Sequence, residues 1–149
     1  MSTLILGIGN PILSDDGVGI RIAQRLKEEK PYLEVETTSE AAITLLDLVV
    51  GYNRLIIIDS IKTGQGKPGE LYKLKLEDFK PAMDSTLSHG IDIATAFELG
   101  ESLGYKMPQV VSMYAVEIRD NQNFAEKCTE EVEGKIPFIV RELIDEEKL

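Results

Sequence analysis

The segment Arg54-Leu55-Ile56-Ile57-Ile58-Asp59 places four large apolar residues in a row between two charged ones. An uninterrupted apolar run of this length is typical of a central strand in a parallel sheet, because helices cover both faces of such a strand. A second short apolar run, Thr3–Ile8, leads into a loop that contains glycine and proline, as expected for another buried strand. The two runs together favour an α/β fold.

The rest of the chain alternates between helix and strand patterns. Val18, Ile22 and Leu26 recur every four residues and predict an amphipathic helix from about Gly17 to Glu29. The other expected elements are a strand at 33–37, a helix from 39 to 50, an edge strand at 70–76, a helix at 90–103, a strand at 109–118 and a helix at 130–147. Thr129 is the expected N-cap of the last helix, and Pro137 should kink it or mark a short first segment.

This alternation predicts the architecture of the whole chain. Strands that alternate with helices imply a mostly parallel, twisted sheet, here of about five strands, with helices on both faces. We therefore expect a three-layer α/β sandwich that forms a single domain over residues 1–149.

Composition excludes several classes of function. The net charge of −10 argues against nucleic-acid binding, which needs clustered lysine and arginine. The single cysteine, Cys128, forms no internal disulfide and suits a reducing compartment. No apolar run approaches the roughly 18 residues of a membrane helix, so we expect a cytoplasmic protein without a membrane partner.

Three side chains fall where an α/β sheet binds ligands, beyond the carboxyl ends of its strands. Asp16 lies between the first strand and the first helix, and Asp59 is the first polar residue after the central apolar run. His89, the only histidine, precedes the helix expected at 90–103. Two carboxylates and one imidazole suit a divalent metal such as nickel or zinc, with positions left open for water or substrate.

Each of these residues also has a purely structural interpretation. Asp15 or Asp16 would cap the helix at Gly17, and capping is the favoured interpretation for Asp15. Asp59 would start an Asx turn with Ser60, and His89 would be an exposed loop residue.

Other signals in the sequence are weaker. The glycines of Gly7-Ile8-Gly9 lack the third glycine of a dinucleotide fingerprint, so no organic cofactor is expected and they suit a tight turn instead. Cys128 has no basic partner nearby in sequence and is not expected to act as a nucleophile. The acidic run Glu142–Glu147 is expected to be a solvated terminus.

Three segments resemble, in the right order, the signatures of hydrogenase maturation endopeptidases. They are Gly7–Gly19 (GIGNPILSDDGVG), Leu55–Ser60 (LIIIDS) and Ser88–Ala96 (SHGIDIATA). The resemblance covers nearly the whole chain and implies that the metal-binding and catalytic positions of the family fall on Asp16, Asp59 and His89. In relatives the first of these is often glutamate, so Asp16 is the shorter variant.

The resemblance also implies an activity. Such enzymes recognise nickel already placed in the precursor of a hydrogenase large subunit and then remove a short C-terminal extension. The nickel would arrive with the substrate, so the free protein would carry no metal of its own. We expect the protein to be a monomer. The metal would polarise the scissile carbonyl or activate a water, or Asp16 or Asp59 would serve as general base. Relatives often have an Asp-Gly-Gly turn where this chain has Glu36–Ser39, which leaves open which large subunit is served.

Two other functions fit parts of the sequence. A nickel-sensing or nickel-delivery module without catalysis would use the same three ligands. Peptidyl-tRNA hydrolases also open with a strand and a Gly-Asn-Pro turn, but that family needs a histidine soon after this turn and a basic surface. Here the histidine is at position 89 and the net charge is −10, which disfavours this alternative.

Overall fold

The computed structural model describes residues 2–39, 44–75 and 90–149. Its strands are β1 (Thr3–Ile8), β2 (Glu34–Thr38), β3 (Arg54–Ile61), β4 (Leu71–Leu74) and β5 (Val110–Glu117). Its helices are the 3-10 turn η1 (Ser14–Gly17), α1 (Val18–Glu29), α2 (Thr44–Val49), α3 (Gly90–Ser102), α4 (Glu130–Glu133) and α5 (Ile136–Glu147).

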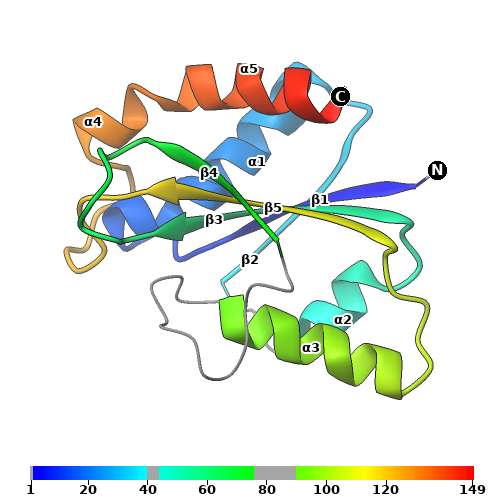
Figure 1. Ribbon diagram of the computed structural model, residues 1–149. Coiled ribbons are helices and arrows are strands. Elements are labelled where there is room, and N and C mark those ends of the chain that lie inside the picture. Colours follow the sequence, from blue (N-terminus) through cyan, green and yellow to red (C-terminus); the bar gives the residue numbers. More distant parts are fainter. Residues whose placement is uncertain (1, 40–43, 76–89) are drawn as a thin grey trace.

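The five strands form one sheet in the order β2-β1-β3-β5-β4. The first four of these are parallel, and β4 pairs antiparallel with β5 at the edge. Helices α1, α4 and α5 lie on one side of the sheet and α2 and α3 on the other (Figure 1). The predicted three-layer α/β architecture and the predicted edge strand are therefore confirmed.

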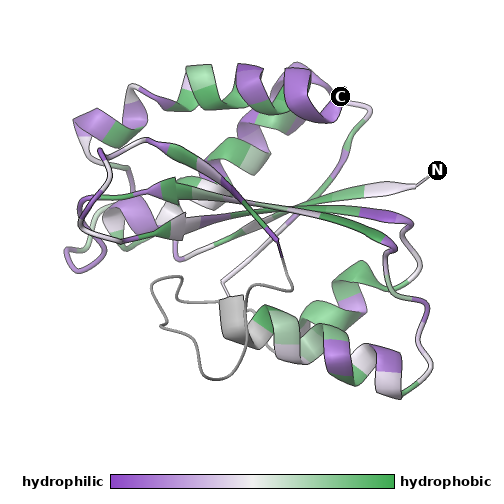
Figure 2. Ribbon diagram, viewed as in Figure 1, coloured by the Kyte–Doolittle hydropathy of each residue, from purple (hydrophilic) through white to green (hydrophobic). Residues whose placement is uncertain are grey.

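Both faces of the central strand are buried, which explains its continuous apolar run. Ile56 and Ile58 belong to a core cluster shared with α1 and α5, whereas Leu55 and Ile57 belong to a second cluster shared with α2 and α3. All four side chains are fully buried. Apolar residues of α1 and α5 pack in the first cluster and those of α2 and α3 in the second, and the helices of both layers carry apolar segments (Figure 2). Because successive residues of a strand point to opposite faces, a strand between two helix layers needs apolar residues at every position.

Strand β3 is longer than its apolar run predicts. Its pairing with β5 continues beyond Ile58, with Asp59 opposite Ala115 and Ser60 opposite Val116. The expectation that Asp59 lies beyond the carboxyl end of this strand was wrong, because Asp59 lies inside the strand. The backbone of β5 provides hydrogen-bonding partners for this extension, and such tertiary pairing overrides the local signal of two polar residues.

The C-terminal region divides as Pro137 suggested. The short α4 ends at Glu133, and α5 follows with Pro137 in its first turn, where proline is tolerated because the N–H it lacks has no partner there. Thr129 occupies the N-cap position of α4, but its side chain makes no capping hydrogen bond to the helix.

Part of the helix expected from residue 39 falls on residues 40–43, outside the described residues, and α2 is described from Thr44. None of the helices in the described ranges is long and apolar enough to cross a membrane.

Glu147 ties the end of α5 to the sheet, although it belongs to the acidic run expected to be solvated. It is 6% exposed and accepts hydrogen bonds from Arg54 Nη2 at 2.6 Å, from Ser112 Oγ at 3.1 Å and from the Tyr114 hydroxyl. Burial alone would raise the pKa of Glu147, but the bonds from Tyr114, Arg54 and Ser112 outweigh it and hold the pKa below its ordinary value of 4.5.

We expect Glu147→Gln to lower the free energy of unfolding at pH 7 by about 2 kcal/mol, because it removes a largely buried, charge-assisted cluster of hydrogen bonds. A carboxyl whose pKa is lowered by folding contributes stability above its unfolded pKa and loses it as pH falls through the folded value. The difference between the two proteins should therefore shrink as the pH falls below 4.5. Urea unfolding at pH 7 and in steps down to pH 3 measures this.

Glu146→Gln is the matched control for this prediction. Glu146 bonds Lys73 at 3.1 Å, and both side chains are 53% exposed. An exposed ion pair contributes at most about 1 kcal/mol, so this variant should unfold almost as the wild type does. Equal effects of the two substitutions would contradict the role given to Glu147.

Candidate active site

The strand order reverses between β1 and β3. The chain passes from β1 through α1 to β2 on one side, and then through α2 to β3 on the other side of β1. In open α/β sheets, ligands bind beyond the carboxyl ends of the strands at such a switch point. Asp16 lies in η1, which follows β1, and Asp59 lies in the last part of β3. One predicted carboxylate therefore follows, and the other belongs to, a strand that flanks this point.

A single serine contacts both carboxylates. The Ser60 hydroxyl donates to Asp16 Oδ1 at 3.1 Å, and the Ser60 backbone N–H donates to Asp59 Oδ1 at 2.7 Å. The second oxygen of Asp16 accepts the Asn10 backbone N–H at 2.9 Å. Asp59 is fully buried, whereas Asp16 is half-buried. The fold therefore brings Asp16 and the Asp59–Ser60 pair to one edge of the sheet.

The structural interpretations of these acids need correction. Neither η1 nor α1 has a side-chain capping hydrogen bond at its N-terminus, so neither Asp15 nor Asp16 caps the helix at Gly17. The expected contact between Asp59 and Ser60 exists, but it lies in a strand paired with β5 and not in an Asx turn.

Asp15 instead fastens a distant loop to the turn that carries Asp16. Its side chain is fully buried. It accepts the backbone N–H groups of Arg119 and Asp120, both at 3.0 Å, and of Thr129 at 2.7 Å, together with the Thr129 hydroxyl. The backbone N–H of Asp15 in turn donates to the Asp120 carbonyl at 3.0 Å. Residues 119–129 are thereby held against the turn beside the candidate site.

Glycines allow this turn to pack closely on the strands. A Cβ on Gly9 would lie 2.1 Å from the Asp16 carbonyl oxygen, and one on Gly19 would lie 2.3 Å from the Ile58 carbonyl oxygen. A Cβ on Gly7 would meet the backbone of Gly19 at 2.6 Å. Gly9 thus serves the tight turn expected from the sequence, whereas Gly7 and Gly19 let α1 approach the sheet.

His89 lies outside the described residues, immediately before α3. Among residues 2–39, 44–75 and 90–149, no group of three or more His, Cys, Asp or Glu side chains is arranged to hold a metal ion. The three-residue site therefore remains a prediction that needs His89. Asp16 is compatible with it, because each of its oxygens accepts one hydrogen bond and a carboxylate has about four acceptor positions.

The only cysteine is not a nucleophile of this site. Cys128 is 5% exposed, and burial, followed by the charge of Asp15, raises the pKa of its thiol to about 11. A buried, protonated thiol is unreactive, in agreement with the interpretation from sequence.

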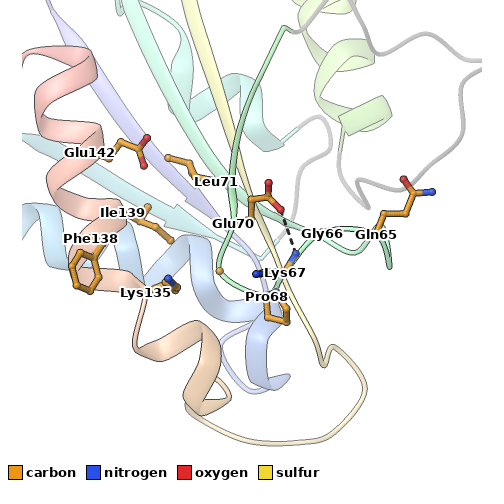
Figure 3. Close-up of a pocket in the computed structure, with 11 residues that line it drawn as sticks. Gln65, Gly66, Lys67, Pro68, Glu70, Leu71, Lys135, Phe138, Ile139 and Glu142 are labelled. Carbon is orange, nitrogen blue, oxygen red and sulfur yellow. Dashed lines mark hydrogen bonds between the residues drawn. The ribbon is translucent and has the colours of Figure 1, made fainter.

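A cleft of about 580 Å³ lies between the segment 65–71 and α5. Phe138 and Glu142 line it from α5, together with Lys135 just before the helix. Lys67, Pro68 and Glu70 lie on the opposite wall (Figure 3). Neither Asp16 nor Asp59 lines this cleft, and Ser60 does not line it either.

Comparison with known proteins identifies the family. The HycI family model, described as hydrogenase maturation protease, matches residues 20–146, a range that includes Asp59 and His89 and begins after Asp16. Hydrogenase 2 maturation protease of Escherichia coli K12 is 30% identical over 98 residues, which cover 63% of this chain and 60% of that protein. The alignment thus spans less than two thirds of that relative.

Solved structures agree with this assignment. The hydrogenase maturating endopeptidase HybD from E. coli superimposes with a TM-score of 0.78 at 23% identity, over 97% of this chain and 91% of that one. The hydrogenase 2 maturation peptidase from a Thaumarchaeota archaeon gives a TM-score of 0.68 at 26% identity, over 97% of each chain. From the matched family model and the shared fold, this chain belongs to the hydrogenase maturation protease family.

Proposed function

We propose that this chain is an endopeptidase that removes the C-terminal extension from the nickel-loaded precursor of a [NiFe]-hydrogenase large subunit. Membership of the family supports the class of reaction. The observation that carries the site is the link from Asp16 through Ser60 to Asp59 at the switch point of the sheet. We expect a cytoplasmic monomer whose partner is this precursor, with no organic cofactor, nucleic acid or membrane.

In this proposal the nickel belongs to the substrate, and Asp16, Asp59 and His89 contact it. Two carboxylates and one imidazole leave the coordination of a divalent metal incomplete until the ligands of the precursor join them. The protein would then act only on a precursor that has received its metal. This dependence is a checkpoint on nickel insertion.

The carboxylates would also supply the acid–base chemistry of hydrolysis. A carboxylate at the site accepts a proton from the attacking water as the new C–O bond forms, and the proton is passed to the amine as the C–N bond breaks. Asp16 is the better placed for this role, because it is half-buried while Asp59 is fully buried. The nickel would polarise the scissile carbonyl or hold the substrate.

The test is a cleavage time course with nickel-loaded and nickel-free precursor at matched concentrations, followed by electrophoresis and mass spectrometry of the released tail. We expect one C-terminal cut of the nickel-loaded form only, and no cleavage of casein. Equal cleavage of both precursors would favour a self-contained metalloprotease instead. No cleavage, with nickel bound by the free protein, would favour the delivery module.

A further inference from the structure

Ser60 and its neighbour Asp59 direct their side chains to opposite faces of the sheet. Along β3, Ile57 and Ile61 pack in the cluster of α2 and α3, whereas Ile56 and Ile58 pack in the cluster of α1 and α5. By this alternation Asp59 belongs to the α2–α3 face and Ser60 to the α1–α5 face. The Ser60 side chain is therefore directed to the side of α1, whose preceding turn carries Asp16.

The Ser60 hydroxyl is buried, with 2% of the residue exposed, and its hydrogen bond goes to Asp16. A buried hydroxyl costs free energy unless it is hydrogen-bonded, and a donor to a carboxylate makes one of the stronger bonds of this kind. The same residue holds Asp59 through its backbone. Ser60 thus contacts both acids at once, through groups that emerge in different directions.

We propose that Ser60 is a positioning residue that sets the placement of Asp16 relative to Asp59. The inference rests on the proposed function, because it takes these carboxylates as the groups that meet the nickel of the precursor. The Asn10 N–H and the Ser60 hydroxyl hold one oxygen of Asp16 each, which fixes the plane of the carboxylate. A catalytic constellation must be held to within about 0.5 Å, and without Ser60 only one of these two restraints remains.

Ser60→Ala tests this, with Ser60→Thr as the rescue variant and Ser112→Ala as the matched control. Ser112 lies on β5 and likewise donates to a carboxylate, Glu147 Oε1 at 3.1 Å, but it pairs with Ile56 and not with the end of β3. The two alanine variants remove the same kind of bond. A purely structural role would therefore give both of them the same loss of stability and the same activity.

We expect Ser60→Ala to lower kcat for the nickel-loaded precursor about tenfold, as for loss of an outer hydrogen-bonding partner at a metal site. KM should change less than about threefold, because a few residues of the interface carry most of the affinity for a large protein and Ser60 is buried. Ser60→Thr should recover most of kcat, and Ser112→Ala should keep the wild-type value. In the absence of nickel, the carboxyl ¹³C resonance of Asp16 should shift in Ser60→Ala but not in Ser112→Ala. The Asp16→Asn variant assigns this resonance.

Two results would overturn the proposal. A Ser60→Ala protein that processes the precursor within twofold of wild type shows that Ser60 does not position the site, and so does an unmoved Asp16 resonance. A wild-type protein that leaves the nickel-loaded precursor uncut overturns the proposed function instead. The resonance then still decides whether Ser60 holds Asp16.

Discussion

Asp59→Asn is expected to slow processing of the nickel-loaded precursor by about 100-fold or more, with little change in the free energy of unfolding. Loss of an outer partner at a metal site already costs about 10- to 100-fold, and loss of a direct anionic ligand should cost at least the upper value. The amide keeps the shape of the side chain, and its oxygen can still accept the Ser60 N–H. Initial rates of tail release and urea unfolding measure the two effects.

His89→Ala is the companion variant. As one of three expected ligands, His89 should be as important for processing as Asp59, and the fold should survive its loss. Asp47→Asn, a change of an exposed acid on α2, is the control for loss of a negative charge. Processing by Asp59→Asn or His89→Ala at the wild-type rate would remove that residue from the site. Unfolding of the variant would assign the residue a structural role.

The sequence predicts the layers of this fold well, because the signals are local. The apolar runs of β1 and β3 and the helical spacing of α1 follow from which faces these elements bury. The end of β3 was missed, because its last three residues pair with β5 more than 50 positions away in the chain. Polar side chains at a buried strand end carry no local sign of such pairing.

Proximity of Asp16 and Asp59 follows from a general rule of parallel sheets, but the hydrogen bonds around them do not. The link through Ser60 and the burial of Asp15 depend on the packing of loops remote in sequence. For Glu147 a signal was present, since it continues the buried stripe of Val140 and Leu143 at helical spacing. An acid on the apolar stripe of a helix indicates a buried partner.

Substitution by asparagine should mainly affect the stability of the fold at Asp15 and mainly affect processing at the adjacent Asp16. Asp15 accepts three backbone N–H groups and one hydroxyl, all donors. In Asp15→Asn one oxygen becomes an NH₂ group that faces donors, so bonds are lost and a repulsive contact is added.

We therefore expect Asp15→Asn to lower the free energy of unfolding by about 2–4 kcal/mol, since each partly buried donor left without a partner costs about 1–3 kcal/mol and the loop relaxes in part. Asp16→Asn should cost less than about 1 kcal/mol, because its partners are one N–H and a hydroxyl that can rotate to accept from the amide. The processing rate per folded molecule should show the reverse order. Asp16→Asn should be the slower variant, because it loses a ligand, whereas Asp15→Asn should lose activity only in proportion to the fraction of unfolded protein. Urea unfolding and initial rates of both variants at matched folded concentration test this. Equal destabilisation by the two substitutions would show that Asp15 does not fasten residues 119–129 to the turn.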